Sequence, residues 1–151
     1  MDERRPVVLV MCTGNSCRSQ MAEGFLKTFG GDRLEVHSAG LEPKEAVHPM
    51  AVEVMKEVGI DISGQRPKSS RVFLGKLAVR YLIIVCSNAE QSCPRLFLGA
   101  IERHFWPFDD PAAATGTPEE QVAVFRRVRD QIKERIETWL KLVNAEGKII
   151  K

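Results

Sequence analysis

The segment that most constrains the fold is a polar loop, residues 12–17, between an apolar run and a segment with helical spacing. The run at residues 7–11 is short, rich in β-branched side chains and preceded by Pro6, so it predicts a buried strand. After the loop, apolar residues recur at helical spacing from Met21 onward, which predicts a helix. A strand, a tight loop and a helix in this order are typical of an α/β protein with a site at the strand's carboxyl end.

The loop region carries Cys12 and Arg18, with five residues between them. Backbone N–H groups and the positive end of the helix dipole converge at such a loop, which suits a tetrahedral oxyanion. Arg18 can donate to two oxygens of that anion, and Gly14 lets the backbone approach it closely. The same positive field is expected to lower the pKa of Cys12 and favour its nucleophilic thiolate, to which Ser19 can donate. We predict that the substrate is bound by Thr13, Gly14, Asn15, Ser16, Cys17 and Arg18.

Cysteines also have a plain structural interpretation, because a free cysteine is usually a small buried apolar residue. For Cys12 the strand–loop–helix context favours the nucleophile instead. For Cys17, inside the same loop, we favour packing over a second reactive thiol.

Two further cysteines, Cys86 and Cys93, follow the most apolar predicted strand, with six residues between them. Structural zinc pairs have two to four intervening residues, so a zinc pair is disfavoured. One interpretation is that Cys86 belongs to the core and Cys93 has no role. The other is a thiol–disulfide relay, which requires Cys86 to come within disulfide distance of Cys12 and then of Cys93.

The dipeptide Asp109-Asp110 precedes Pro111 in a loop after a predicted strand. Proline keeps the backbone of Asp110 extended, which helps to direct its side chain. A purely structural interpretation is that these residues form an Asx-type turn. Beside Cys12 and Arg18, however, a carboxylic acid can protonate a departing oxygen, so we predict that Asp110 is the general acid.

Strand and helix patterns alternate along the rest of the chain. Strands are predicted at residues 34–38, 81–85 and 104–108, and helices at 48–58 and 118–144, with a short helix within 69–76. The alternation predicts an α/β fold, a single-domain four-stranded parallel sheet flanked by helices with right-handed crossovers. We assign residues 1–144 to this domain and residues 145–151 to a flexible tail.

Composition excludes several classes of protein. A net charge of +2 over 151 residues gives no reason to expect nucleic-acid binding, and no segment is apolar and long enough for a membrane span. The three histidines, His37, His48 and His104, are scattered and form no metal-ligand pattern. We expect a cytoplasmic monomer with no bound metal, in a compartment where cysteines serve catalysis or redox sensing more often than structural bridges.

Taken together, these motifs resemble those of the thioredoxin-coupled arsenate reductases, which share the low-molecular-weight tyrosine phosphatase fold. The similarity extends to about residue 142, with the motifs in the family's order. It rests on residues 12–24, Ser38-Ala39-Gly40, Met55-Lys56-Glu57-Val58, Ile60-Asp61-Ile62-Ser63, residues 86–94, Phe108-Asp109-Asp110-Pro111 and Phe125-Arg126-Arg127-Val128-Arg129-Asp130.

The resemblance implies a mechanism. Cys12 attacks arsenate held by the loop and Arg18, while Asp110 assists the loss of an oxygen. Cys86 then attacks the Cys12 sulfur and releases arsenite, and Cys93 takes over the disulfide and presents it to reduced thioredoxin. No cofactor is bound in this scheme, and thioredoxin is the external reductant.

Two alternatives remain open from the sequence. A phosphatase would use Cys12, Arg18 and Asp110 but has no need of Cys86 or Cys93. Phosphatases of this fold usually carry tyrosines after the Asp-Pro pair, whereas here the chain reads Ala112-Ala113-Ala114-Thr115-Gly116. We therefore favour a reductase with weak phosphatase side activity. A non-catalytic redox sensor or oxyanion-binding module is the other alternative.

Several family members hold a potassium ion beneath the loop. The corresponding residues here are Asn15, Glu23 and Ser38, but an aspartate of the family site aligns with Lys68. We expect the ammonium group of Lys68 to pair with Glu23 in place of the ion, so that activity does not depend on potassium.

Overall fold

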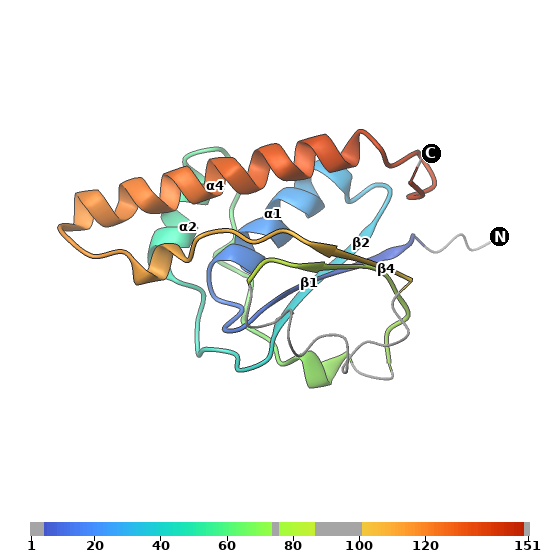
Figure 1. Ribbon diagram of the computed structural model, residues 1–151, viewed down its shortest axis with the longest axis horizontal. Helices are drawn as coiled ribbons and strands as arrows, with labels where there is room; N and C mark the ends of the chain where they lie inside the picture. Colours follow the sequence, from blue (N-terminus) through green and yellow to red (C-terminus); the bar gives the residue numbers. More distant parts are fainter. Residues whose placement is uncertain (1–4, 74–75, 87–100, 150–151) are drawn as a thin grey trace.

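The computed structural model describes residues 5–73, 76–86 and 101–149, and its centre is a parallel sheet (Figure 1). The strands are β1 (Val7–Cys12), β2 (Glu35–Gly40), β3 (Val79–Ile84) and β4 (Glu102–Phe105). They lie in the order β2-β1-β3-β4, and every pair is parallel. The predicted four-stranded parallel sheet is therefore confirmed.

β1 lies between β2 and β3, and its residues from Val8 onward are at most 4% exposed. A central parallel strand is covered on both faces, which explains why its sequence is a continuous apolar run rather than an alternating one. Because β1 and β3 are neighbours in register, with Met11 opposite Ile84, the residues that follow them come out at the same edge of the sheet.

The main helices are α1 (Arg18–Gly30), α2 (Pro49–Lys56) and α4 (Pro118–Leu140), and they contact one another beside the sheet (Figure 1). α4 begins with a capping box, in which Thr117 and Glu120 satisfy each other's backbone N–H groups. Two short 3₁₀ helices, η1 (Ser70–Val72) and η2 (Pro111–Ala113), complete the described elements. None of the described helices is long and apolar enough to cross a membrane.

The bounds of several elements differ from the predicted ones. β4 begins and ends earlier than expected, although the Trp106 and Phe108 N–H groups still donate to Ile84 and Val85 on either side of Pro107. Proline has no N–H group, so regular pairing stops there. α4 ends at Leu140 rather than at residue 144, because the chain turns back on itself.

The C-terminal segment makes ordered contacts as far as residue 149, which the prediction of a flexible tail at residues 145–151 did not include. Val143 and Ile149 form an antiparallel bridge, and the Asn144 N–H donates to the Lys148 carbonyl over 2.8 Å. The buried Tyr81 hydroxyl donates to the Gly147 carbonyl, also over 2.8 Å. The contact between Tyr81 and Gly147 joins residues far apart in the sequence, so local sequence patterns did not reveal it.

Candidate active site

The loop at residues 12–17 lies where β1 ends and α1 begins, as predicted. Asn15 holds it in shape: its backbone has a φ of 50°, and its side chain is completely buried. Asparagine is one of the few residues that adopts this left-handed conformation readily. Its Nδ2 donates to Ser19 Oγ over 2.8 Å and to Ser38 Oγ over 2.9 Å, so the loop is tied to both α1 and β2.

The loop forms the floor of a cavity of about 550 Å³. The predicted site residues that line this cavity are Cys12, Thr13, Gly14, Asn15, Ser16, Cys17, Arg18, Cys86 and Asp110. Glu42, Lys44, Ala112 and Ala113 complete the wall, and the sequence analysis had not assigned a role to Glu42 or Lys44. The structure thus brings together residues from four separate parts of the chain.

Arg18 is held at the side of the cavity with part of its donor set unused. Its Nη1 donates to the Phe108 carbonyl over 2.9 Å, and its Nη2 lies 3.7 Å from Asp110 Oδ2. Its Nε is buried and has no hydrogen-bond partner among the described residues. A buried unpaired donor of a guanidinium beside a cavity is suited to an anion.

Asp110 forms the Asx-type turn, and its side chain also lies at the cavity. Its Oδ1 accepts a hydrogen bond from the Ala112 N–H over 3.0 Å, which is the Asx-type turn at the start of η2. Its other oxygen, Oδ2, faces Arg18, and the side chain is 45% exposed. The turn therefore positions the carboxyl group at the cavity, while its role as an acid stays a prediction.

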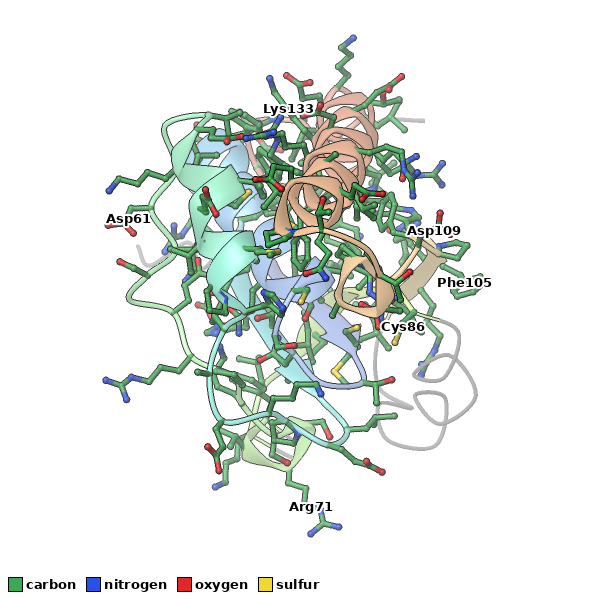
Figure 2. All side chains as sticks on the ribbon, turned by 90° about the vertical axis from the view of Figure 1, so that its left-hand side faces the viewer. Asp61, Arg71, Cys86, Phe105, Asp109 and Lys133 are labelled. Atoms are coloured by element: carbon green, nitrogen blue, oxygen red, sulfur yellow. The ribbon has the colours of Figure 1, made fainter. Side chains whose placement is uncertain are left out.

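Cys86 follows β3 and lies against the loop. The Thr13 N–H donates to Cys86 Sγ over 3.1 Å, and Thr13 Oγ1 is 3.3 Å from the same sulfur. Figure 2 shows Cys86 on the same side of the molecule as Asp109. The strand neighbours β1 and β3 thus deliver Cys12 and Cys86 to one cavity.

The pKa of Cys12 differs from the sequence expectation. Its interaction with the Cys86 thiol, and then its burial, raise the pKa of Cys12 above the ordinary value. Arg18 and the Thr13 N–H act in the opposite direction. Two adjacent thiols cannot both ionise easily, and the sequence analysis considered the approach of Cys86 to Cys12 only for the relay, not for its effect on this pKa.

Three predicted site residues remain to be placed: Ser19, Cys17 and Cys93. Ser19 Oγ accepts a hydrogen bond from Asn15, and its predicted donation to Cys12 stays a prediction. Cys17 is 4% exposed, and its burial raises its pKa to about 11, which favours packing. Cys93 lies outside the described residues, so its position stays a prediction.

Asn15, Glu23 and Ser38, which the resemblance relates to a potassium site, come together beneath the loop. The Ser38 hydroxyl donates to Glu23 Oε1, and the predicted contact with Lys68 is present, with Nζ 3.6 Å from the same oxygen. Lys27 lies closer still, 2.5 Å from Glu23 Oε2. The sequence analysis missed Lys27, although its position one helical turn after Glu23 is a usable signal.

Gln20 is a second residue that the sequence analysis missed. It is completely buried, and its Nε2 donates to the Asn15 carbonyl over 2.9 Å and to the Arg66 carbonyl over 3.0 Å. These bonds fasten the loop to the segment that carries Lys68. A buried glutamine in the first turn of a helix has no distinctive spacing, so the sequence offered no signal for it.

A cysteine sulfur, a guanidinium and a backbone N–H at one cavity, where a strand meets a helix, define an oxyanion-binding cysteine enzyme. The sequence matches the family model described as low molecular weight phosphotyrosine protein phosphatase over residues 7–149. The chain belongs to this family, which confirms the resemblance in fold.

Within the family, the chain is similar to proteins named arsenate reductase. It is 48% identical to that of Halalkalibacterium halodurans over 136 residues, covering 89% of this chain and 95% of the relative. It is 44% identical to that of Bacillus subtilis over 135 residues, covering 88% and 94%. A solved structure of an arsenate reductase in the phosphate-binding state superposes with a TM-score of 0.75 at 38% identity, covering 92% of this chain and 99% of the other.

Proposed function

We propose that this protein reduces arsenate to arsenite through three cysteines, with thioredoxin as the external reductant and no bound cofactor. The observation that carries the proposal is the position of Cys86, whose sulfur lines the same cavity as Cys12 and accepts the Thr13 N–H. Hydrolysis of a phosphate ester needs only one thiol. A second thiol beside the nucleophile serves disulfide formation.

The first step is binding of the oxyanion by the loop N–H groups and by Arg18, whose buried Nε is available as a donor. The anion needs the Thr13 N–H that donates to Cys86 Sγ in the free enzyme. Binding therefore displaces Cys86 from this donor. It also weakens the interaction that most raises the pKa of Cys12, so the nucleophile is activated when substrate arrives.

The thiolate of Cys12 then attacks arsenic and forms a sulfur–arsenic bond. An oxygen leaves as water after it receives a proton from Asp110, and arsenic is still pentavalent at this stage. Next, the thiolate of Cys86 attacks the Cys12 sulfur. A disulfide forms, the sulfur–arsenic bond breaks, and its electron pair remains on arsenic, which leaves as trivalent arsenite.

The enzyme is regenerated by a second exchange. Cys93 attacks Cys86, which frees the Cys12 thiolate and forms a Cys86–Cys93 disulfide for reduction by thioredoxin. We place this cycle in the cytoplasm, where thiol pools keep cysteines reduced. The support for these steps is the second thiol in the cavity and the similarity to arsenate reductases.

A weak phosphatase activity accompanies the reductase activity, because the cavity binds a tetrahedral anion whatever its central atom. The wall beside Asp110 consists of Ala112 and Ala113, which offer no aromatic ring to a phosphotyrosine. Tyr81, the single tyrosine of the chain, is completely buried. These residues favour a small inorganic anion over an aryl ester.

The proposal is tested by NADPH oxidation with arsenate, thioredoxin and thioredoxin reductase. Wild type is expected to turn over repeatedly, and Cys93→Ser is expected to stop after one cycle. If arsenate causes no oxidation while aryl phosphate is hydrolysed rapidly by both forms, the protein is a phosphatase and the proposed function is wrong.

A further inference from the structure

Lys44 lines the active-site cavity and has no part in the mechanism above. It comes from the segment between β2 and α2, and its side chain is exposed. Within residues 5–73, 76–86 and 101–149, no carboxylate forms an ion pair with it. Its charge is therefore not neutralised by a neighbouring side chain of the described structure.

The position of Lys44 is fixed by two contacts with Gly14. Its backbone N–H donates to the Gly14 carbonyl over 3.0 Å. Its methylene carbons lie 3.2 to 3.5 Å from where a Cβ on Gly14 would be, so the aliphatic stem covers the loop backbone. A lysine packed along its stem keeps its ammonium group in water at the edge of the packed surface, which here is the edge of the cavity.

The field of this ammonium group reaches one thiol of the loop, that of Cys17. Lys44 lowers the pKa of Cys17, as Arg18 does, whereas Asp110 raises it. Glu42 also lines the cavity, but it is not among the charges that shift this thiol. Lys44 is therefore a second cation beside Arg18 at the position of Cys17.

We propose that Lys44 is a specificity-determining residue, whose ammonium group at the cavity edge favours small anions over neutral molecules, and favours multiply charged oxyanions most. The inference rests on the proposed function only in naming arsenate as one such anion. Arg18 holds the anion directly, and Lys44 adds a longer-range attraction that is screened by salt.

The test compares two alkylating agents of similar size, anionic iodoacetate and neutral iodoacetamide, in their rates of reaction with Cys12. Peptide mapping identifies the modified cysteine. Lys44→Met keeps the stem and removes the charge, and Lys44→Arg restores a charge. Lys141→Met is the matched control, because Lys141 is also exposed but caps the far end of α4 (Figure 1).

We expect Lys44→Met to reduce the ratio of the iodoacetate rate to the iodoacetamide rate roughly two- to fivefold at low salt, as typical for one exposed charge. Lys44→Arg is expected to restore the ratio, and Lys141→Met to leave it unchanged. Inorganic phosphate should protect Cys12 from iodoacetamide with a dissociation constant higher by a similar factor in Lys44→Met.

An unchanged ratio in Lys44→Met, or an equal change in Lys141→Met, would overturn the proposal. So would a change in the KM for thioredoxin with no change in phosphate protection, since Lys44 would then belong to a protein-docking surface. The alkylation rates and the phosphate protection need no arsenate turnover, so a protein that fails to reduce arsenate would still give a result for Lys44.

Discussion

Asn15 determines the shape of the anion-binding loop, and replacing it measures how much that shape depends on one side chain. Its side chain donates to Ser19 and Ser38 and accepts the Lys68 N–H over 2.8 Å. The residue is completely buried and has a φ of 50°. Two replacements, Asn15→Gly and Asn15→Ala, separate the contribution of the side chain from that of the backbone.

Asn15→Gly keeps the backbone conformation but removes all the side-chain hydrogen bonds. The Lys68 N–H is left without its acceptor, at about 1–3 kcal/mol, and each lost hydrogen bond to a serine contributes about 0.5–1.5 kcal/mol. Part of this loss is recovered by water, so we expect the free energy of unfolding to fall by about 2–4 kcal/mol.

Asn15→Ala adds backbone strain, because alanine in the left-handed region is unfavourable by about 1–2 kcal/mol. Glycine loses about 0.5–1 kcal/mol through the greater freedom of its unfolded chain. The alanine variant is therefore expected to be less stable than the glycine variant by up to about 1.5 kcal/mol.

Urea denaturation followed by tryptophan fluorescence measures both differences, since Trp106 and Trp139 are buried in the core. Protection of Cys12 by phosphate, measured in parallel, reports whether the loop still binds an anion, and it should weaken in both variants. A glycine variant as stable as wild type, or an alanine variant more stable than the glycine variant, would refute this account of the loop.

Three further predictions concern other parts of the site and fold. Because the Cys86 thiol raises the pKa of Cys12, Cys86→Ala should move the midpoint of the pH profile for Cys12 alkylation to lower pH; a shift to higher pH would show the opposite coupling. Wild-type activity should be equal in sodium and potassium buffers, whereas Lys68→Asp should become potassium-activated; strong activation of wild type would contradict the role given to the lysine. Tyr81→Phe leaves the Gly147 carbonyl without its donor, so the thermal midpoint should fall by about 2–10 °C with turnover retained, and an unchanged midpoint would show that the C-terminal turn adds no stability.

The sheet and the loop were predictable because their signals are local. The apolar run before Cys12 and the helical spacing after Arg18 placed the loop at a strand end. The alternation of strands and helices then predicted a parallel sheet, whose strands all end at the same edge. Cys86 and Asp110 follow two of these strands and were therefore expected beside the loop. The contact between Lys68 and Glu23 was predicted from the family resemblance, and the structure confirms it.

Features that depend on contacts between distant segments were not predictable in the same way. The direction of the pKa shift at Cys12 depends on the approach of Cys86. The folding of the C-terminal segment depends on a hydroxyl from β3, and the place of Lys44 depends on its packing against Gly14. In each case the property depends on a neighbour from another part of the chain, which local sequence patterns do not identify.

The most direct test of the three-cysteine relay is a single-turnover experiment with Cys93→Ser and arsenate, without thioredoxin. Arsenite is quantified, and the cysteines are mapped by mass spectrometry. We predict one arsenite per enzyme molecule and a disulfide between Cys12 and Cys86. Arsenite formation without this disulfide, or no arsenite from a folded variant that still binds phosphate, would contradict the relay.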